Sequence, residues 1–209
     1  MRRYKINNIM KGKMMMKYYA YGSCTNLNSF NETLNTGGFD GQYKIISVGR
    51  SEGYKLAFTR KMNSSSGALD IIESAGDYVL GVVYEIPDAA ISTINKREGY
   101  PTAYKHLKIN VSLGEEKLEV LTYVVVDKHR EEVCPSKEYY NRVLEGMKNR
   151  FPKTYINQYF ISHYNEKFGG TESLLGESNL YHDADHDAQF KKQSLGVIEE
   201  NELFYRLLR

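Results

Sequence analysis

One glutamate near the middle of the chain has the surroundings of a general acid or base. Glu98 stands seven residues after Ile91 and four after Ile94. In a helix these three side chains share one face, so the carboxylate is directed at the same core as the isoleucines. Burial and the negative end of the helix dipole both raise a carboxyl pKa, which prepares the group for proton transfer. The plainer alternative is an ion pair with Arg97 or Lys96.

A second candidate is the stretch YYAYGSCTNL, residues 18–27, in which a strand-like run ends at Gly22, Ser23 and Cys24. Cys24 as a nucleophile would need a base, and no local motif connects any of the 5 histidines to it. Small residues after a strand also form nests, whose free N–H groups bind an anion such as a carboxylate. The plainest alternative is an ordinary turn that ends the strand.

The run HDADHD, residues 182–187, contains metal-binding residue types. Two histidines four residues apart share a helical face and, with the aspartates, could bind a divalent cation. Such runs are more often solvated loops, so we assign no metal site here.

Composition narrows the class of protein. The chain has 209 residues, a formal charge of +2 and 2 cysteines. This length suits one domain with appendages, and the charge predicts neither a nucleic-acid partner nor an anionic membrane. The few cysteines favour a reducing, cytoplasmic setting, and no apolar run approaches the roughly 18 residues that a membrane span needs.

Strand-like runs dominate the chain before Asp127. They alternate or are rich in β-branched and aromatic residues, and a turn is expected at Gly76–Asp77. Seven short strands with turn-length links predict a curled or barrel-like antiparallel sheet in an α+β protein. The runs are residues 17–21, 43–48, 54–59, 68–72, 78–86, 106–111 and 117–126.

Three helices are expected before residue 169. The first covers residues 87–99, with Pro87 at its start and Gly99 as a left-handed stop. The second follows a Ser136 N-cap and ends before Pro152, and the third covers about residues 153–168. We therefore expect a dispensable leader over 1–16, a domain over 17–168, and a C-terminal extension over 169–209 with a loop and a short helix.

Several of these stretches resemble the γ-glutamylcyclotransferase-like family. YYAYGSCTNL resembles the Tyr-Gly-Ser-Asn loop of that family, and GALDIIESAGDYVLGVVYEI followed by INKREGYPTAY resembles its central strands and the helix that ends in Glu-Gly. Order and spacing agree over about residues 17–150. The resemblance implies a small antiparallel or mixed β-barrel flanked by α-helices. It also implies release of 5-oxoproline from γ-glutamyl compounds without a metal or cofactor.

The resemblance also implies roles for individual residues. Glu98 falls on the family's acid/base, Tyr104 on an active-site tyrosine shortly after it, and Tyr139 on another tyrosine of the pocket. The substrate-binding loop falls on Tyr21, Gly22, Ser23, Cys24 and Thr25.

In two places the chain departs from the family pattern. Cys24 stands where many relatives have asparagine, with Asn26 two places later, so a contact from that asparagine side chain is in question while backbone contacts survive. The loop also lacks the Leu-Ile-Trp continuation of the glutathione-specific ChaC-type branch, which argues against glutathione as the substrate.

These observations lead to one hypothesis and two rivals. The hypothesis is a cytoplasmic enzyme that acts on a small γ-glutamyl amide, peptide or amine through Glu98, with no cofactor and no nucleic-acid or membrane partner. The first rival is a non-catalytic binding module on the same fold. The second is a thiol hydrolase that uses Cys24. The sequence predicts neither the leaving group of the substrate nor the oligomeric state.

Overall fold

The computed structural model describes residues 14–169. The chain divides after Arg150 into two units, Met1–Arg150 and Phe151–Arg209. The predictions made for the HDADHD run and for the terminal helix lie outside the described residues. The predicted domain limits at residues 16 and 168 stay predictions.

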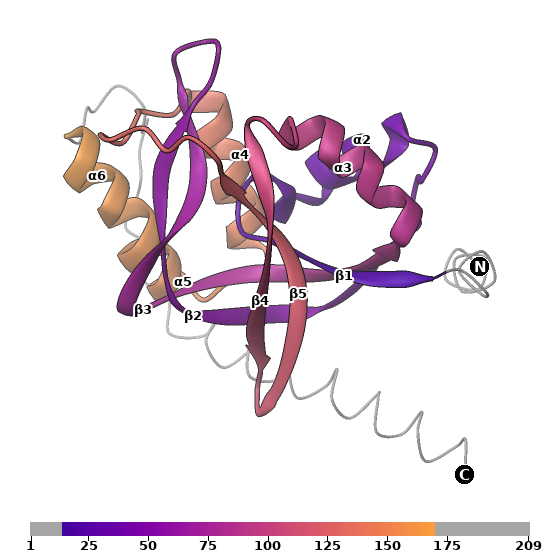
Figure 1. The fold of residues 1–209 in the computed structure, drawn as a ribbon. Helices are drawn as coiled ribbons and strands as arrows, with labels where there is room; N and C mark the ends of the chain where they lie inside the picture. The colour runs from indigo at the N-terminus through magenta and orange to yellow at the C-terminus, as the bar shows by residue number, and fades with distance from the viewer. Residues whose placement is uncertain (1–13, 170–209) are drawn as a thin grey trace. The chain divides into compact units, whose positions relative to one another are not determined.

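The first unit is built on a closed barrel with the strand order β1-β3-β2-β4-β5 (Figure 1). Its neighbours pair antiparallel except β1 and β5, which meet in parallel at Tyr18 and Leu121. The predicted barrel is therefore confirmed, with one parallel pair that closes it. The strands are β1 (Met15–Ala20), β2 (Lys44–Lys61), β3 (Gly67–Pro87), β4 (Tyr104–Leu113) and β5 (Glu116–Val125).

Four of the predicted strands are halves of two long ones. Residues 43–48 and 54–59 fall in or beside β2, and residues 68–72 and 78–86 fall in β3. The expected turn at Gly76–Asp77 is wrong, because the register shifts between Glu52 and Tyr54 and β3 continues past the irregularity. Gly76 takes φ +87 there, and the Ser74 hydroxyl donates to Asp77 Oδ2 at 2.6 Å. A bulge thus bends the β2–β3 hairpin without ending it.

The barrel interior is closed by Tyr19. Its side chain is fully buried, and its hydroxyl donates to the Val79 carbonyl at 2.8 Å. A Cβ added at Gly81 would lie 2.5 Å from the Tyr19 ring, so this strand position has room only for glycine. The close approach fixes where β1 crosses β3.

Aromatic side chains form a row across the outer face of four adjacent strands. Tyr84 of β3 stacks with Tyr18 of β1 at 6.2 Å, and Tyr18 meets Tyr123 of β5 edge-on at 6.1 Å. His106 of β4, the cross-strand partner of Tyr123, continues the row at 5.0 Å. Aromatic pairs of this kind stabilise a sheet beyond the area that they bury.

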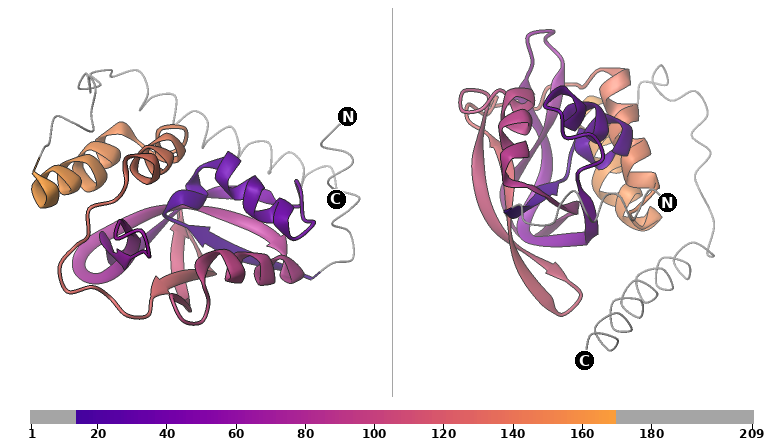
Figure 2. Two further views of the ribbon diagram at one scale, coloured as in Figure 1. Left: turned by 90° about the horizontal axis from the view of Figure 1, so that it is seen from above. Right: turned by 90° about the vertical axis from the view of Figure 1, so that its right-hand side faces the viewer.

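Two helices cover this row on one side of the barrel (Figures 1 and 2). Helix α2 (Leu27–Thr36) stacks Phe30 on Tyr84 at 4.1 Å. The sequence pattern did not predict α2, since its asparagines and threonines have low helix propensity. It begins at an N-cap, where the Asn26 side chain accepts from the N–H groups of Asn28 and Ser29.

The helix that carries Glu98 forms as predicted. A short 3₁₀ turn, η2 (Asp88–Ala90), leads into α3 (Ile91–Glu98). Gly99 ends α3 in the left-handed conformation with φ 63 and ψ 35. On its inner face Ile94 is fully buried.

The Ser136 N-cap is confirmed at the start of α4 (Lys137–Lys148), where its hydroxyl accepts from the Tyr139 N–H. The second unit continues as one helical run of α5 (Lys153–Tyr155), η3 (Ile156–Ile161) and α6 (Ser162–Phe168), so the expected helix over 153–168 is confirmed. Its middle segment, η3, is a π-helix. Helix α4 ends at Lys148 with Asn149 as its C-cap, three residues before the predicted end at Phe151, and Pro152 is the N-cap of α5.

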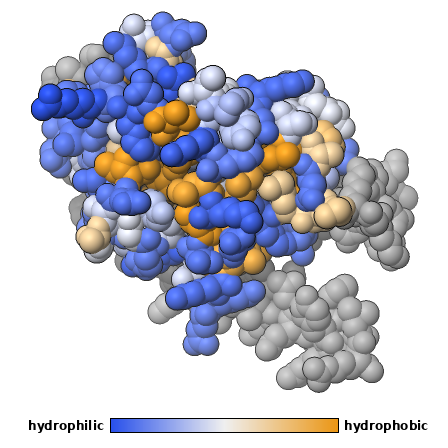
Figure 3. Space-filling view, in the orientation of Figure 1, coloured by the Kyte–Doolittle hydropathy of each residue, from blue (hydrophilic) through white to orange (hydrophobic). Residues whose placement is uncertain are grey.

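One face of the molecule is mostly hydrophilic with apolar side chains gathered across its middle (Figure 3). Large apolar side chains with substantial exposure include Tyr100 at 41% and Val126 at 46%. Among residues 14–169, no helix combines the length and the apolar character that crossing a membrane requires.

Candidate active site

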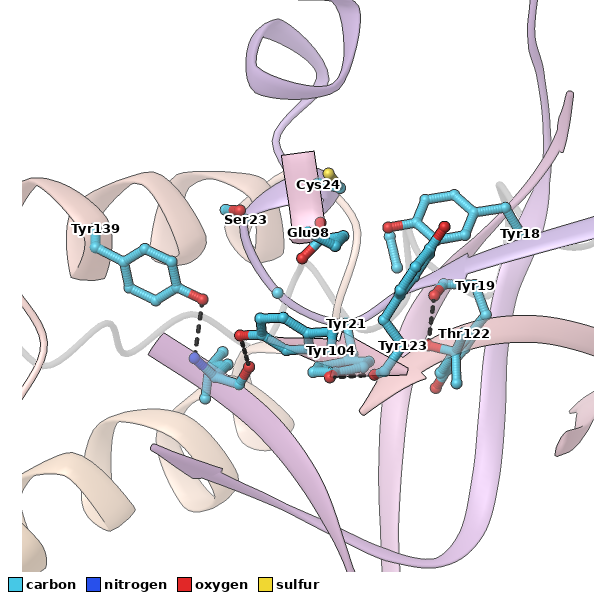
Figure 4. A pocket seen from close by; sticks show the side chains of 13 residues that line it. Tyr18, Tyr19, Tyr21, Ser23, Cys24, Glu98, Tyr104, Thr122, Tyr123 and Tyr139 are labelled. Carbon is cyan, nitrogen blue, oxygen red and sulfur yellow. Dashed lines mark hydrogen bonds between the residues drawn. The ribbon is translucent and has the colours of Figure 1, made fainter. Parts of the chain in front are cut away.

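A pocket of about 40 Å³ lies where β1, the turn after it, α3 and the first turn of α4 come together (Figure 4). It is several times larger than the roughly 10–15 Å³ that one water requires. Glu98, Tyr104 and Tyr139 line it together with the turn from Tyr21 to Cys24, so the structure brings almost all the predicted site residues into one place. The other lining residues are Tyr18, Tyr19, Ala20, Leu69, Thr122 and Tyr123.

The turn after β1 has the geometry of a backbone cradle. The 3₁₀ turn η1 (Ser23–Thr25) begins after Gly22, whose carbonyl accepts from the N–H and the hydroxyl of Thr25 at 2.9 and 2.8 Å. Within residues 14–169, the hydrogen bonds of this turn use the N–H groups of Thr25 and Asn26 and not those of Gly22, Ser23 and Cys24. Three successive N–H groups beside a pocket suit an anion or a developing oxyanion.

Thr25 is the one predicted site residue outside the pocket lining. It is fully buried, and its hydroxyl bonds the Gly22 carbonyl. Helix α4 packs on it closely, since a Cβ at Gly146 would lie 2.3 Å from Thr25 Oγ1 and 2.4 Å from Asn26 N. Thr25 therefore supports the turn from beneath and does not face the pocket.

Glu98 is the last residue of α3, and its carboxylate points into the pocket (Figure 4). Its side chain is 19% exposed. Burial raises the pKa of Glu98, and the nearby Arg97 guanidinium opposes part of that rise. The direction agrees with the expectation from the helix position.

Glu98 also forms a weak ion pair with Arg97, the alternative that the sequence offered. Arg97 Nε lies 3.7 Å from Glu98 Oε1, a distance of attraction without a short hydrogen bond. Since burial outweighs this attraction, the net effect still favours the protonated carboxyl.

Two tyrosine hydroxyls hold the backbone of Leu69 at the pocket wall. The Leu69 N–H donates to Tyr139 Oη at 2.9 Å, and the Tyr104 hydroxyl donates to the Leu69 carbonyl at 3.0 Å. Tyr21 donates to the Tyr123 carbonyl at 2.6 Å. Burial raises the pKa of Tyr21, Tyr104 and Tyr139, so these phenols keep their protons at neutral pH.

Cys24 lacks the features of a nucleophile. It is 3% exposed, and burial raises the pKa of its thiol to about 11. Its carbonyl accepts from the Tyr84 hydroxyl at 2.9 Å. His106 packs against the pocket residue Tyr123, but its Nε2 lies 2.7 Å from Asn95 Oδ1 and it does not line the pocket.

Sequence reasoning missed several wall residues. Three of them stand directly before the predicted substrate-binding loop, and this position in the sequence could have identified them as pocket residues. They are Tyr18, Tyr19 and Ala20 of β1. Three other lining residues come to the pocket only because their strands pair with distant ones, and no short stretch of sequence predicts that pairing. They are Leu69, Thr122 and Tyr123.

Comparisons with known proteins agree with this fold. A family model described as the AIG2-like family matches residues 78–159. The gamma-glutamylcyclotransferase of Bos taurus is 30% identical over 145 residues, which cover 66% of this chain and 73% of that protein. YkqA of Bacillus subtilis (strain 168), provisionally described as a gamma-glutamylcyclotransferase, is 34% identical over 66% of this chain. The chain therefore belongs to the AIG2-like, gamma-glutamylcyclotransferase family.

Solved structures support the same assignment. The crystal structure of YkqA gives a TM-score of 0.65 at 26% identity and covers 78% of this chain and 59% of that chain. A solved gamma-glutamyl cyclotransferase is 18% identical to this chain and has a TM-score of 0.58, which shows that the fold is shared. The match covers 86% of this chain and 99% of that chain. The chain spans only about half the length of YkqA, 48% by sequence.

Proposed function

We propose that this chain releases 5-oxoproline from small γ-glutamyl amides, peptides or amines. In the reaction the α-amine of the substrate attacks its own γ-carbonyl carbon, a five-membered ring closes, and the amide C–N bond breaks to free the amine. The enzyme then has to fold the substrate and to move protons. A single observation carries the proposal: Glu98, whose pKa is raised by burial, lines the same pocket as Gly22, Ser23 and Cys24, whose N–H groups are not used by the hydrogen bonds of their turn.

Glu98 is the proposed general base and acid. It takes a proton from the attacking α-amine and delivers it to the departing nitrogen, so that no proton has to be exchanged with solvent in between. A carboxyl pKa raised towards the working pH suits both steps. It ends α3 and lies beside Ser23 and Cys24 (Figure 4), so the carboxylate is close to the proposed oxyanion donors.

The hydroxyl directions support one orientation of the substrate. Tyr139 accepts from the Leu69 N–H, so its own proton is free to bond an oxygen of the substrate. Tyr104 donates to the Leu69 carbonyl, so its oxygen presents lone pairs to an amine. We assign the α-carboxylate or γ-carbonyl oxygen to the side of Tyr139 and the turn, and the α-amine to the side of Tyr104 and Glu98.

The proposal needs no protein nucleophile. The substrate supplies its own amine, and the raised thiol pKa of Cys24 makes a thiolate scarce at neutral pH. Cys24 then serves as a small residue at which a backbone N–H approaches the ligand.

Product identification tests the reaction. The purified protein is incubated with γ-glutamyl dipeptides, γ-glutamyl-lysine and γ-glutamyl polyamines, and each is paired with an analogue whose α-amine is acetylated. We expect 5-oxoproline from at least one free amine and none from its acetylated partner, because acetylation blocks the attack. Release of glutamate would indicate hydrolysis. No product from any substrate by folded protein would favour the binding-module alternative.

A further inference from the structure

Arg97 makes an unusual number of contacts for a residue beside a proposed acid/base. Its Nη1 donates to Thr33 Oγ1 at 2.6 Å and to the Ser29 carbonyl at 3.4 Å. Its Nη2 donates to Ser29 Oγ and to Ser23 Oγ, both at 2.9 Å. Its Nε faces Glu98 Oε1 at 3.7 Å. The guanidinium of Arg97, on α3, therefore contacts two other elements of the first unit, η1 and α2, besides Glu98 of its own helix.

These elements carry different parts of the site. Ser23 belongs to the turn with the proposed oxyanion donors, and Glu98 belongs to α3. Ser29 and Thr33 face Arg97 from α2, which packs on the aromatic row and does not line the pocket. Arg97 thus joins the proposed oxyanion turn and the proposed acid/base through a third, rigid element.

We propose that Arg97 is a positioning residue for the acid/base: its guanidinium fixes the Ser23 turn relative to Glu98 and places a permanent positive charge beside the carboxylate. The inference rests on the proposed function of Glu98 as the acid/base. Arg97 itself does not line the pocket, so its effect on the reaction runs through its neighbours.

Within residues 14–169, the charge that acts on the pKa of Glu98 is that of Arg97. The titratable groups that interact with Glu98 from the other elements are neutral at pH 7, since each has a raised pKa. Among the described residues, Arg97 is the charged group that lowers the pKa of Glu98. Replacing it by a neutral side chain should therefore raise that pKa further. The neutral groups are Tyr18, Tyr21, Cys24, Tyr104, Tyr123 and Tyr139.

Two substitutions separate charge from geometry. Arg97→Met removes the charge and the hydrogen bonds of the guanidinium. Arg97→Lys keeps the charge, but an ammonium group cannot make the same set of hydrogen bonds as the planar guanidinium. Lys96→Met is the matched control, because it removes one positive charge from an exposed position next to Arg97 on the same helix. Thr33→Val removes the acceptor at 2.6 Å from Nη1 at nearly constant volume, and it serves if Arg97→Met fails to fold.

Two measurements are made on each variant. The first is the pH profile of kcat/KM for 5-oxoproline formation. The second is titration of Glu side-chain carboxyls by ¹³C NMR, with the Glu98 resonance assigned through Glu98→Gln, which needs no turnover. In Arg97→Met we expect the acidic limb of the kcat/KM profile and the titration of the Glu98 resonance to shift to higher pH by the same amount. On the acidic side, kcat/KM should be roughly tenfold lower than in the wild type. Lys96→Met should titrate like the wild type.

The remaining variants report on geometry. In Arg97→Lys the acidic limb of the kcat/KM profile should lie at the same pH as in the wild type, because the charge remains. The value of kcat/KM should fall roughly evenly at all pH values, because the Ser23 turn is less firmly held. Thr33→Val should show a smaller loss of the same kind. An unchanged Glu98 titration in Arg97→Met would overturn the inference even if the enzyme is active. A shifted Glu98 titration in a protein that forms no 5-oxoproline would support the Arg97–Glu98 coupling while it refutes the proposed function.

Discussion

The backbone N–H of Leu69 donates to the hydroxyl oxygen of Tyr139 at 2.9 Å, although the two residues are 70 positions apart in the chain. This contact joins strand β3 to helix α4 at the pocket wall. It also determines the direction of the phenol, because an oxygen that accepts from the backbone leaves its own proton for another partner.

Tyr139→Phe should therefore reduce kcat/KM more than it reduces stability. The variant loses one donor to the substrate and leaves the Leu69 N–H without its acceptor, and a hydrogen bond to a charged group is worth about 1.5–3 kcal/mol. We expect a loss of roughly tenfold to a hundredfold. Steady-state kinetics beside urea unfolding measures both effects. Tyr140→Phe, one position along the same helix, is the matched control and should keep kcat/KM.

Cys24 should be dispensable for turnover and slow to alkylate. Burial and a thiol pKa of about 11 leave little thiolate at pH 7.5, whereas Cys134 is exposed. Peptide mapping after iodoacetamide should find Cys134 modified first, with activity retained, and Cys24→Ala should keep kcat within about tenfold. Loss of activity in step with alkylation of Cys24 would support the thiol-hydrolase alternative.

Gly146 should be sensitive to a single methyl group. In Gly146→Ala the new Cβ would collide with Thr25 Oγ1 and Asn26 N at 2.3 and 2.4 Å, so α4 or the turn must move. Overpacking of this kind costs about 1–3 kcal/mol. We expect a lower free energy of unfolding together with a higher KM, since the turn is displaced. Arg142→Ala on the exposed side of α4 is the comparison and should change neither value.

Glu98→Gln should stabilise the fold near neutral pH. Burial raises the carboxyl pKa above its ordinary 4.5, so the folded state holds the proton more tightly than the unfolded chain does. The stability that this gives is complete below the unfolded pKa and is lost as pH rises through the folded pKa. Glutamine has no such loss, so the variant should unfold at higher urea concentration at pH 7 and approach the wild type near about pH 4.

An exposed carboxylate provides the control for this effect. Glu119→Gln alters a side chain that is 61% exposed, and it should show no comparable change between the two pH values. Equal midpoints for wild type and Glu98→Gln at both pH values would mean that the carboxylate is not desolvated.

The helix that carries Glu98 was predictable because its determinants are local. Pro87, Asp88 and Gly99 mark its limits, and the spacing of Ile94 and Glu98 fixes the face. The same holds for the Ser136 cap of α4. These elements depend on caps, dipoles and periodicity that a short stretch of chain contains.

The rest of the site depends on contacts between distant residues. Tyr104 reaches Leu69 across 35 positions, and Thr122 reaches Tyr19 across 103, so the pocket wall exists only once the barrel closes. Helix α2 also escaped prediction, since the packing of Phe30 on Tyr84 outweighs the low helix propensity of its asparagines. The contacts of Arg97 with Ser29 and Thr33 depend on α2, so the sequence did not predict them either.

The most direct test of the account is the rate of 5-oxoproline formation by Glu98→Gln beside the wild type, measured by mass spectrometry on the best substrate of the panel at several pH values. Glutamine keeps the shape of the side chain but cannot transfer the proton. The account predicts a fall in kcat of about 100-fold to 10,000-fold at every pH, with a folded protein and nearly unchanged substrate binding. A variant within threefold of the wild type would contradict the assignment of Glu98 as the acid/base.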